Sequence, residues 1–391
     1  MKIALYNLTT TTRWGGVETF VWEVAAQLAG RGHHVEIFGG RSGGRGLGHA
    51  HGPAARPRAR GVRVRTFPCI DRDVWRRLPL LHRQYGLTKL LERLSMAPFA
   101  LPALLSGRFD VVHIQKPYDL PIGALVKLSG ARLVLGCHGK DFWPGDRLFV
   151  RFVDAAVSAS RFNAAQVHAR YGLWPVVVYN GVDLDRFRPE PSNDVVVLTR
   201  YGLEPSTEHS PALLYAGRLV RWKGVEYLIR AMPLVMPRTT RLWVAGEGPY
   251  RQSLQALAVR CGVADRVRFL GKVEQHELAA LYRSCAMLVA TSFANETFGM
   301  ALCEAMACGT PVVASDFGGF REVVLDGVTG LLTRPQDPCD LAEKINALLA
   351  DPHRARRMGL AGRERVLAMF TWQAVTDRLE EVYTCLARSC T

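Results

Sequence analysis

The chain alternates short apolar segments with helical segments, and this alternation restricts its fold more than any other feature. Residues 3–6 form a compact apolar strand, a loop with two adjacent glycines follows, and apolar residues then recur at helical spacing until Gly30 and Gly32. A second apolar strand follows at 35–38. A strand, a glycine turn, a helix and a strand in this order predict a βαβ unit in a parallel sheet.

The same rhythm continues along the chain and then restarts. Further strands are predicted at 111–114, 133–135 and 176–179, followed by a second series at 212–216, 241–245, 267–270, 287–290 and 311–314. A chain of 391 residues also exceeds what one hydrophobic core usually supports. We therefore predict an α/β protein with two Rossmann-like domains, each built on a doubly wound parallel sheet.

Proline content and helical periodicity predict where the domains end. Residues 189–193 hold two prolines, which block both helix and sheet, so this segment is a predicted linker. The domains are predicted at 1–188 and 189–367. Apolar residues at helical spacing between Trp372 and Leu386 predict a final amphipathic helix within the segment 368–391.

Basic residues are concentrated in the first half of the chain. The formal net charge is +15, and residues 1–190 hold 27 Lys and Arg against 14 Asp and Glu. Residues 41–65 place arginines among glycines and prolines, which predicts a long mobile basic loop. Residues 74–94 interleave aromatic and aliphatic side chains with Arg and Lys, which favours a surface that lies on an anionic bilayer. The alternative for this segment is a crossover helix packed on the sheet with a solvated basic face.

Composition also argues against several classes of protein. The nine cysteines are scattered and form no pair with two residues between them, so neither a disulfide framework nor a zinc module is predicted. No signal-peptide pattern and no run of about 18 apolar residues occurs, so we expect a cytoplasmic protein that does not span a membrane. No motif that reads nucleic acid accompanies the positive charge, so no nucleic-acid partner is predicted.

The most informative motif is the segment 295–314, where the predicted strand 287–290 ends and a helix begins. Open α/β sheets bind ligands at the carboxyl ends of their strands. Gly299 lets a ligand approach the backbone, and the amide groups at the start of the helix suit a diphosphate. Glu304 can accept hydrogen bonds from ribose hydroxyls, and Glu296 can accept them from sugar hydroxyls.

This segment resembles the signature of two glutamates eight residues apart that marks retaining nucleotide-sugar glycosyltransferases of family 4. Three other segments agree with that family in order. These are 216–224, which resembles its G-R-x4-K-G loop, 245–249, which resembles its G-x-G-P turn, and 180–183, which resembles the approach to its second domain. The resemblance is dense from 180 to 385 and almost absent from 41 to 105. It implies the GT-B fold, in which two Rossmann-like domains face a central cleft, the last helix crosses back to the first domain, and hinge closure assembles the site.

The resemblance and the chemistry together suggest which residues act. A departing diphosphate needs positive charge, and Arg218 and Lys223 flank a loop that follows a strand. His138 resembles the family histidine that contacts the transferred sugar near the reacting carbon. The predicted catalytic residues are His138, Arg218, Lys223 and Glu296. The predicted donor-binding residues are Gly15, Gly16, Arg218, Lys223, Gly246, Lys272, Val273, Glu296, Phe298, Gly299, Met300, Ala301 and Glu304, with the segment 271–273 close to the base.

These residues predict a retaining, metal-independent glycosyltransferase with no cofactor besides its nucleotide-sugar substrate. It would move a hexose from a UDP- or GDP-linked donor to a glycan, lipid-linked or lipopolysaccharide-type acceptor. The basic first domain would hold the acceptor, at the cytoplasmic face of the inner or plasma membrane. No carboxylate nucleophile is marked in the sequence, so the resemblance implies a front-face substitution in which the departing phosphate helps to deprotonate the acceptor hydroxyl.

Two alternatives stay open from the sequence. A nucleotide-sugar epimerase of the same fold would share the donor site and need no acceptor. A non-catalytic basic protein that binds a membrane surface would explain the charge but not the pattern of glycines and glutamates. A dehydrogenase is weaker, because the first turn holds Gly15 and Gly16 without the full G-x-G-x-x-G pattern.

Overall fold

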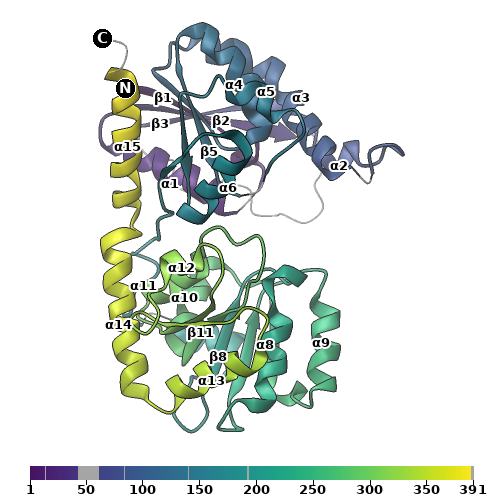
Figure 1. Cartoon of the computed structure of the whole chain (residues 1–391), viewed down its shortest axis with the longest axis vertical. Coiled ribbons are helices and arrows are strands. Elements are labelled where there is room, and N and C mark those ends of the chain that lie inside the picture. Colours follow the sequence, from purple (N-terminus) through teal and green to yellow (C-terminus); the bar gives the residue numbers. More distant parts are fainter. Residues whose placement is uncertain (14, 43–60, 83, 140, 192, 389–391) are drawn as a thin grey trace. The chain divides into compact units, whose positions relative to one another are not determined.

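The computed structural model divides into two compact units, each built around its own sheet (Figure 1). The first unit comprises Met1–Tyr179 together with Trp372–Thr391, and the second comprises Asn180–Thr371. The structure describes residues 1–13, 15–42, 61–82, 84–139, 141–191 and 193–388. None of the helices within these ranges is both long enough and apolar enough to cross a membrane.

The sheet of the first unit has seven parallel strands in the order β3-β2-β1-β4-β5-β6-β7. The strands are β1 (Lys2–Tyr6), β2 (His34–Ser42), β3 (Val62–Cys69), β4 (Val111–Ile114), β5 (Arg132–Cys137), β6 (Ala155–Ser158) and β7 (Val176–Val177). The chain begins in the middle of the sheet, moves outward to β3 and returns to the other side of β1 at β4. The chain therefore adds strands on one side of β1 and then on the other, and the strand order reverses between β1 and β4. Doubly wound sheets bind ligands at this switch point.

Helices cover both faces of this sheet. Successive residues of a strand point to opposite faces, so each strand contributes to two cores. Ile3 and Leu5 belong to one core with α1 and α15, whereas Ala4 and Tyr6 belong to a second core with α3 and α4. The helices of the unit are α1 (Gly16–Gly30), α2 (Arg72–Trp75), α3 (Tyr85–Ser106), α4 (Leu120–Val126), α5 (Asp146–Val150), α6 (Arg161–Tyr171) and α15 (Trp372–Arg388).

The sheet of the second unit repeats this plan with six parallel strands in the order β10-β9-β8-β11-β12-β13. Its strands are β8 (Ala212–Ala216), β9 (Arg241–Ala245), β10 (Val267–Gly271), β11 (Met287–Ala290), β12 (Val312–Ser315) and β13 (Leu331–Thr333). Its helices are α7 (Asp194–Arg200), α8 (Val225–Ala231), α9 (Arg251–Arg260), α10 (Gln275–Ser284), α11 (Met300–Ala307), α12 (Phe320–Val323), α13 (Pro338–Leu349) and α14 (Pro352–Met369). Its switch point lies between β8 and β11.

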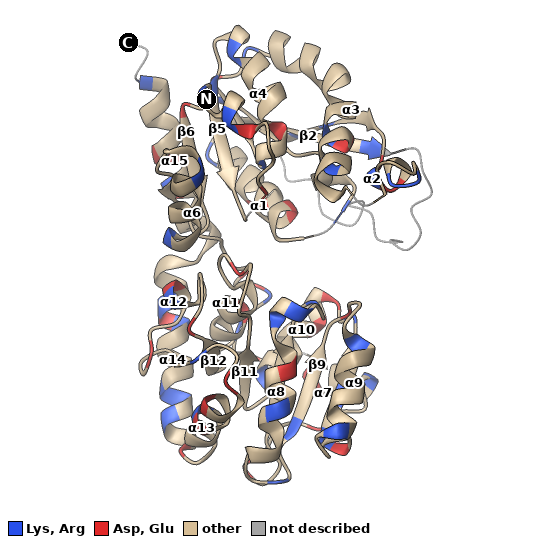
Figure 2. Ribbon diagram, turned by 45° about the vertical axis from the view of Figure 1, so that its right-hand side comes forward, with Lys and Arg blue, Asp and Glu red and all other residues tan. Residues whose placement is uncertain are grey.

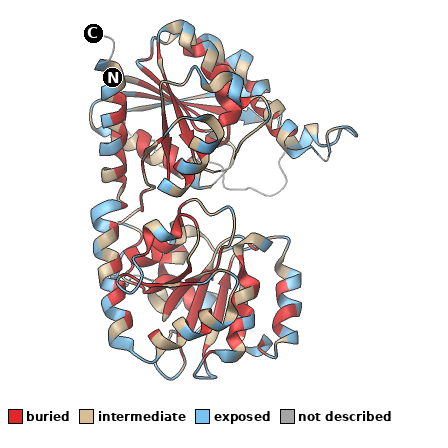
Figure 3. Cartoon of the chain, viewed as in Figure 1, coloured by how far each residue is buried: buried red, intermediate tan, exposed pale blue. Residues whose placement is uncertain are grey.

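The prediction of two doubly wound parallel sheets is confirmed, and the strands of both sheets are largely buried (Figure 3). All five strands predicted in the second series are present, with their ends shifted by at most one residue. The sequence did not predict β3, β6 or β13. These strands are short or lie in segments rich in charged residues, where apolar periodicity is weak.

The prediction of a loop over 41–65 is wrong at both of its ends. Arg41 is the eighth residue of β2, and Arg63 and Arg65 lie on β3, which pairs with β2 along its whole length. Val62 and Val64 alternate with these arginines, and Arg65 lies over the ring of Phe38, so the alternation is that of an edge strand. Residues 43–60, with Arg45, Arg56, Arg58 and Arg60, lie outside the described residues.

The segment 74–94 contains the end of α2, a run of turns and the first half of α3, while Arg83 lies outside the described residues. The prediction that its basic residues form one surface is wrong for α3, which packs as a crossover helix. Lys89 and Arg93 are buried on the side of the core, whereas Leu87 and Leu94 are exposed.

The two units divide between Tyr179 and Asn180, whereas the sequence placed the first domain boundary at 188. Residues after Tyr179 are anchored inside the second unit. Phe187 packs on Tyr282 with ring centroids 6.0 Å apart, and the backbone N–H of Val182 donates to the carbonyl of Phe370. At the other end, the second unit extends to Thr371 instead of 367, and α15 packs in the first unit.

Candidate active site

A half-buried ion pair lies at the switch point of the second sheet. Lys223 follows β8 and Glu296 follows β11, and the Lys223 Nζ donates to Glu296 Oε2 at 2.6 Å. The hydroxyl of Ser292 donates to the same oxygen at 2.9 Å. The two ionic side chains are only 20% and 12% exposed. The ammonium and the carboxylate are therefore fixed in place before any ligand arrives.

A glycine holds the lysine loop against the end of β11. Gly224 has a φ of +69°, and a Cβ at this position would lie 2.1 Å from the carbonyl oxygen of Thr291. The Thr291 hydroxyl donates to the carbonyl of Lys223 at 3.0 Å. Only glycine permits this close approach at this φ, so the loop geometry that places Lys223 depends on it.

Arg218 and Lys223 both lie close to the ring of Trp222. The Arg218 guanidinium carbon is 5.5 Å from the centroid of the Trp222 ring, and the Lys223 Nζ is 5.0 Å from the same centroid. Tyr215 donates from its hydroxyl to the carbonyl of Arg218 at 3.0 Å. The loop after β8 thus carries two positive charges around one indole ring, next to the Glu296 carboxylate.

The turns that follow β8, β9 and β10 are in contact with one another. Gly246 has a φ of +147°, and a Cβ there would meet the carbonyl oxygen of Gly217 at 1.9 Å. The N–H of Gly246 donates to the carbonyl of Gly271 at 2.8 Å. The predicted base-contacting residues come next: Lys272 is exposed and pairs with Glu274, and Val273 is half-buried.

The start of α11 is formed by the residues that the sequence predicted. Gly299 has a φ of +117°, and a Cβ there would lie 2.7 Å from the ring of Phe320. Phe298 is buried against Phe370, with ring centroids 5.5 Å apart. Met300 and Ala301 form the first turn of the helix and are half-buried.

Glu304 lies on α11 with its carboxyl group buried. The Tyr282 hydroxyl donates to Glu304 Oε2 at 2.9 Å. Burial raises the pKa of Glu304 to about 7, against smaller lowering effects of the Tyr282 hydrogen bond and the Arg186 charge. The carboxyl group therefore changes its charge near neutral pH, and hydroxyl donors from a ligand would favour the ionised form.

In the first unit, His138 directly follows β5 at the carboxyl edge of the sheet. Its Nε2 lies 2.9 Å from the Oε1 of Gln115, and its ring meets that of Phe20 edge-on at 4.9 Å. Burial, with a further contribution from the Lys116 charge, lowers the pKa of His138 to about 4. The imidazole is therefore neutral at physiological pH.

Gly15 and Gly16 lie at the first strand-to-helix turn, and Gly16 begins α1. Gly15 is extended, and a Cβ there would lie 2.7 Å from Glu18 Oε2. Glu18 is buried and accepts a hydrogen bond from the Thr9 hydroxyl at 2.5 Å. Gly15 thus leaves room for a buried carboxylate at the switch point of the first sheet, a role that sequence reasoning did not assign.

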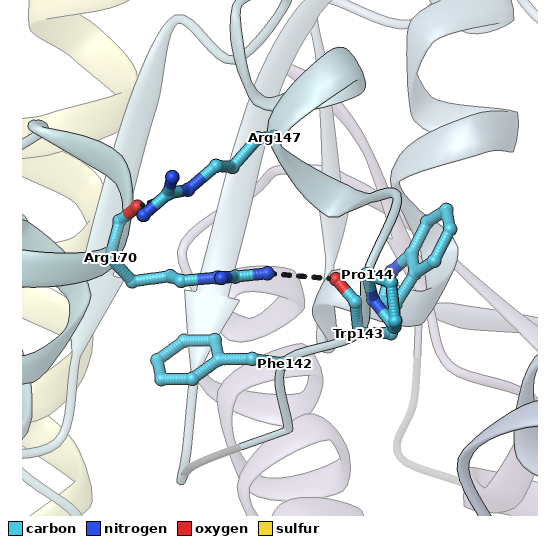
Figure 4. A pocket seen from close by; sticks show the side chains of 5 residues that line it. All are labelled: Phe142, Trp143, Pro144, Arg147 and Arg170. Carbon is cyan, nitrogen blue, oxygen red and sulfur yellow. Dashed lines mark hydrogen bonds between the residues drawn. The ribbon is translucent and has the colours of Figure 1, made fainter.

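A cavity of about 520 Å³ opens beside the loop that follows His138 (Figure 4). Arg170 lies along Phe142 and donates to the carbonyl of Trp143 at 3.0 Å, and the Trp143 indole N–H donates to the carbonyl of Pro117 at 2.9 Å. Arg147 donates from its Nε to the carbonyl of Arg170. The cavity thus has a fixed aromatic wall and two guanidinium groups.

Comparison with known proteins identifies the family. A model of "Glycosyltransferase Family 4" matches residues 14–186, and a model of "Glycosyl transferases group 1" matches residues 204–365. A D-inositol 3-phosphate glycosyltransferase from Xylanimonas cellulosilytica is 33% identical over an alignment of 406 positions, which spans 94% of this chain and 91% of the relative. The chain is a group 1 glycosyltransferase. This assignment overturns the alternative of a non-catalytic binding protein.

Other relatives of this glycosyltransferase agree in family and fold. A GDP-mannose-dependent α-(1-6)-phosphatidylinositol monomannoside mannosyltransferase from Mycolicibacterium smegmatis is 35% identical over 300 residues, which cover 71% of this chain and 78% of the relative. Anabaena HepE, solved with UDP-glucose, superposes with a TM-score of 0.74 at 22% identity and covers 98% of this chain and 100% of its own. A Thermosynechococcus elongatus sucrose-phosphate synthase gives 0.77 at 23% identity and covers 99% of both chains. The fold is GT-B.

The predicted site residues of the glycosyltransferase fall into two groups. His138, Gly15 and Gly16 lie in the first unit, and all the others lie in the second. Within the second unit, Lys223 and Glu296 are in direct contact, and Arg218 shares the Trp222 ring with Lys223. Their catalytic and binding roles stay predictions.

Sequence reasoning missed Gln115 and Lys89. Gln115 directly follows the apolar strand 111–114, and this place at the carboxyl end of a strand is a signal that could have identified it. Lys89 lies in a helix that was interpreted as surface, and no feature of the sequence marks it as buried.

Proposed function

We propose that this glycosyltransferase moves a hexose from a UDP- or GDP-linked donor to a hydroxyl group of its acceptor, with retention of configuration and without a metal ion. The Lys223–Glu296 pair at the switch point of the second sheet carries this proposal, together with Arg218, which contacts the same Trp222 ring as Lys223. Departure of a nucleoside diphosphate leaves negative charge, and fixed cations stabilise that charge most in a site from which water is largely excluded.

Each predicted residue has a role that its surroundings support. Lys223 and Arg218 would neutralise the departing diphosphate, and the first amides of α11 would donate to it. Glu296 holds Lys223 with one oxygen and would accept from sugar hydroxyls with the other. Glu304 would accept from the ribose, and its buried carboxyl becomes ionised when those donors arrive.

Retention would proceed on one face of the sugar. The departing phosphate would take the proton of the acceptor hydroxyl as the new glycosidic bond forms and the bond to the phosphate breaks. His138, which is neutral at pH 7 because burial lowers its pKa to about 4, would hydrogen-bond the transferred sugar without adding charge.

The acceptor belongs to the first unit in this proposal. Relatives are named for D-inositol 3-phosphate and for a phosphatidylinositol monomannoside, so we favour a cyclitol-containing or lipid-linked acceptor over a lipopolysaccharide core. The test is a panel of UDP-, GDP- and ADP-sugars screened for thermal stabilisation, followed by transfer assays and assignment of the product anomer by NMR. An inverted product, or an isomerised donor formed without acceptor, would contradict the proposal.

We also propose that the enzyme works at the cytoplasmic face of an anionic membrane. The segment around α2 exposes large apolar side chains next to arginines, as Figure 2 shows for the charges. The exposed apolar residues are Val74, Leu78, Leu80 and Tyr85, and the arginines are Arg72, Arg76 and Arg77. Exposed apolar side chains with arginines beside them are typical of proteins that bind anionic bilayers, although Asp73 pairs with Arg76 in this segment.

A matched pair of leucines tests the membrane proposal. Leu80 is 87% exposed beside α2, and Leu128 is 80% exposed after α4. We expect Leu80→Asp to weaken co-sedimentation with vesicles that contain phosphatidylglycerol, because it places a like charge against the lipid, whereas Leu128→Asp leaves co-sedimentation unchanged. Equal binding of wild type to neutral and anionic vesicles would refute this location.

A further inference from the structure

Two buried cations and one half-buried cation face two carboxylates at the carboxyl edge of the first sheet. Lys89 and Arg93 come from α3, Lys116 follows β4, and the carboxylates are Asp119 and Asp141. The basic side chains are 10%, 2% and 16% exposed. This small region therefore has one positive charge in excess, largely removed from water.

One cation of this cluster, Arg93, already has an ionic partner in Asp119. Arg93 pairs with Asp119 with both side chains fully buried, and its other terminal nitrogen donates to the Oδ1 of Asn7 at 3.2 Å. This pair fixes α3 against the sheet. The excess charge thus resides on Lys89 and Lys116.

The two lysines share one carboxylate. Lys116 Nζ donates to Asp141 Oδ2 at 2.9 Å, and Lys89 Nζ donates to Oδ1 of the same group. An ammonium group has three donors, and each lysine gives one of them to Asp141. The Lys89 ammonium also lies 4.7 Å from the centroid of the Tyr118 ring. Asp141 therefore holds the two ammonium groups near each other without neutralising both.

The pKa shifts of Lys89 and Asp141 agree with one excess positive charge in this region. Burial and then the neighbouring Lys116 lower the pKa of Lys89 to about 8, and the two lysines hold the pKa of Asp141 well below its usual range. Uncompensated charge is costly in a desolvated site. An anion that accepts from both ammonium groups would remove this cost.

Part of the cluster lies close in the sequence to His138, which we expect to lie near the reacting sugar, and thus near the acceptor. Asp141 lies three residues after His138 in the loop that follows β5, and Lys116 directly follows Gln115, the hydrogen-bond partner of His138. The Lys116 and Asp141 charges both act on the pKa of His138. A group bound by the lysines would thus lie beside the histidine that we expect to contact the transferred sugar.

We propose that Lys89 and Lys116 bind a phosphate group of the acceptor, which competes with the Asp141 carboxylate for the donors of both lysines. This inference rests on the proposed function and narrows it, because it makes the acceptor a phosphate-bearing polyol and not a neutral glycan. The phosphate could be a monoester on a soluble cyclitol or sugar, or the diester of a lipid headgroup. Both present anionic oxygens to the same two donors.

Binding to the full chain tests the proposal directly. Inorganic phosphate, D-inositol 3-phosphate as a monoester and glycerophosphoinositol as a diester are titrated by calorimetry. We expect Lys89→Met and Lys116→Met each to weaken binding of the preferred ester by about 10- to 100-fold, the effect of losing one hydrogen bond to a charged group. The stronger of the two esters identifies the source of the phosphate.

Lys127 provides a matched control. It forms a comparable ion pair with Asp154 at 2.6 Å, at the amino ends of β5 and β6 and thus at the opposite edge of the sheet. Lys127→Met should leave phosphate binding unchanged. Equal weakening by Lys127→Met, or no weakening by either site variant, would overturn the proposal.

Asp141→Asn separates a phosphate site from a structural ion pair by the sign of its effect. Removing the competing carboxylate should tighten phosphate binding, whereas a purely structural pair predicts lower stability with no gain in affinity. Lys116→Arg keeps the charge and should retain most of the binding, which keeps the test valid if Asp141→Asn does not fold.

Binding of the nucleotide-sugar donor distinguishes failure of this inference from failure of the proposed function. The lysine variants should bind UDP- or GDP-sugars as wild type does, with a raised KM for the acceptor and little change in kcat. If they do so while their phosphate binding equals that of wild type, this inference fails and the proposed function stands. If wild type binds none of the nucleotide sugars, the proposed function itself fails.

Discussion

The contact between Lys223 and Glu296 joins two loops that are 73 residues apart in the sequence. Neither side chain alone indicates a function, since isolated basic and acidic residues usually lie at the surface. The ion pair between them, which is half-buried at a switch point, fixes the position of each charged group. Ser292 strengthens this arrangement because it donates to the same carboxylate oxygen.

Lys223→Met should lower kcat/KM by about 10²- to 10³-fold, the range found when one preorganised charge-stabilising donor is removed. The unfolding temperature should also fall by a few degrees, because the Glu296 side chain is 12% exposed and keeps only the Ser292 hydrogen bond when Lys223 is removed. Lys344→Ala on α13 removes an exposed lysine that pairs with Glu343 and serves as the control. Transfer by Lys223→Met at the wild-type rate would show that the site lies elsewhere.

Glu304 should make the second unit less stable as pH rises. Its pKa is raised from 4.5 to about 7 in the folded chain, so the folded state binds the proton more tightly than the unfolded state. The stabilisation is complete below pH 4.5 and is lost as pH rises through 7, by up to about 3 kcal/mol. Glu304→Gln should remove this slope in urea unfolding at pH 5 and pH 8. An unchanged slope in the variant would assign the effect to another group.

At the scale of single elements, glycine turns and strands followed the sequence closely, but helix α3 did not. Its basic residues alternate with leucines, and helical periodicity does not say which face is buried when the two kinds are interleaved. Lys89 and Arg93 are buried because the ends of β4 and β5 supply carboxylates to them. Leu87 and Leu94 are exposed in their place.

The turn that places Lys223 offers a test with an internal control. Gly224 and Gly262 have nearly equal φ values of +69° and +66°, but a Cβ would meet the Thr291 carbonyl at Gly224 and open space at Gly262. Gly262→Ala should cost about 1 kcal/mol, from the unfavourable φ alone. Gly224→Ala should cost at least about 2 kcal/mol more and abolish transfer, because the lysine loop must move. Chemical denaturation measures both variants, and equal costs would contradict the role of the close approach.

At the scale of the whole molecule, the chain leaves its first unit after Tyr179 and returns to it with α15. This helix supplies Trp372, Leu379 and Tyr383 to the core that contains α1. Glu380 on its polar side pairs with Arg31 and His33 at 2.7 Å. The first unit therefore depends on the last segment of the sequence for one of its faces.

Leu379→Ala should destabilise the first unit by about 2 to 5 kcal/mol, because the side chain is fully buried. Arg378→Ala, which removes an exposed ion pair with Glu381, should change stability by no more than about 0.5 kcal/mol. Hydrogen exchange should show loss of protection in β1 to β7 and not in β8 to β13. Equal loss in both sheets would contradict the assignment of α15 to the first unit.

The amino-acid sequence was enough to predict two doubly wound sheets and their glycine turns, although not β3, β6 or β13, because apolar periodicity and glycine are local signals. The resemblance to the family also brought Lys223, Glu296 and Glu304 into one hypothesis. Which charges are shielded from water was decided by the packing of distant segments. The Lys89 and Lys116 pair on Asp141, the carboxylate over Gly15 and the return of α15 each depend on contacts between distant segments, and no local pattern specifies those contacts.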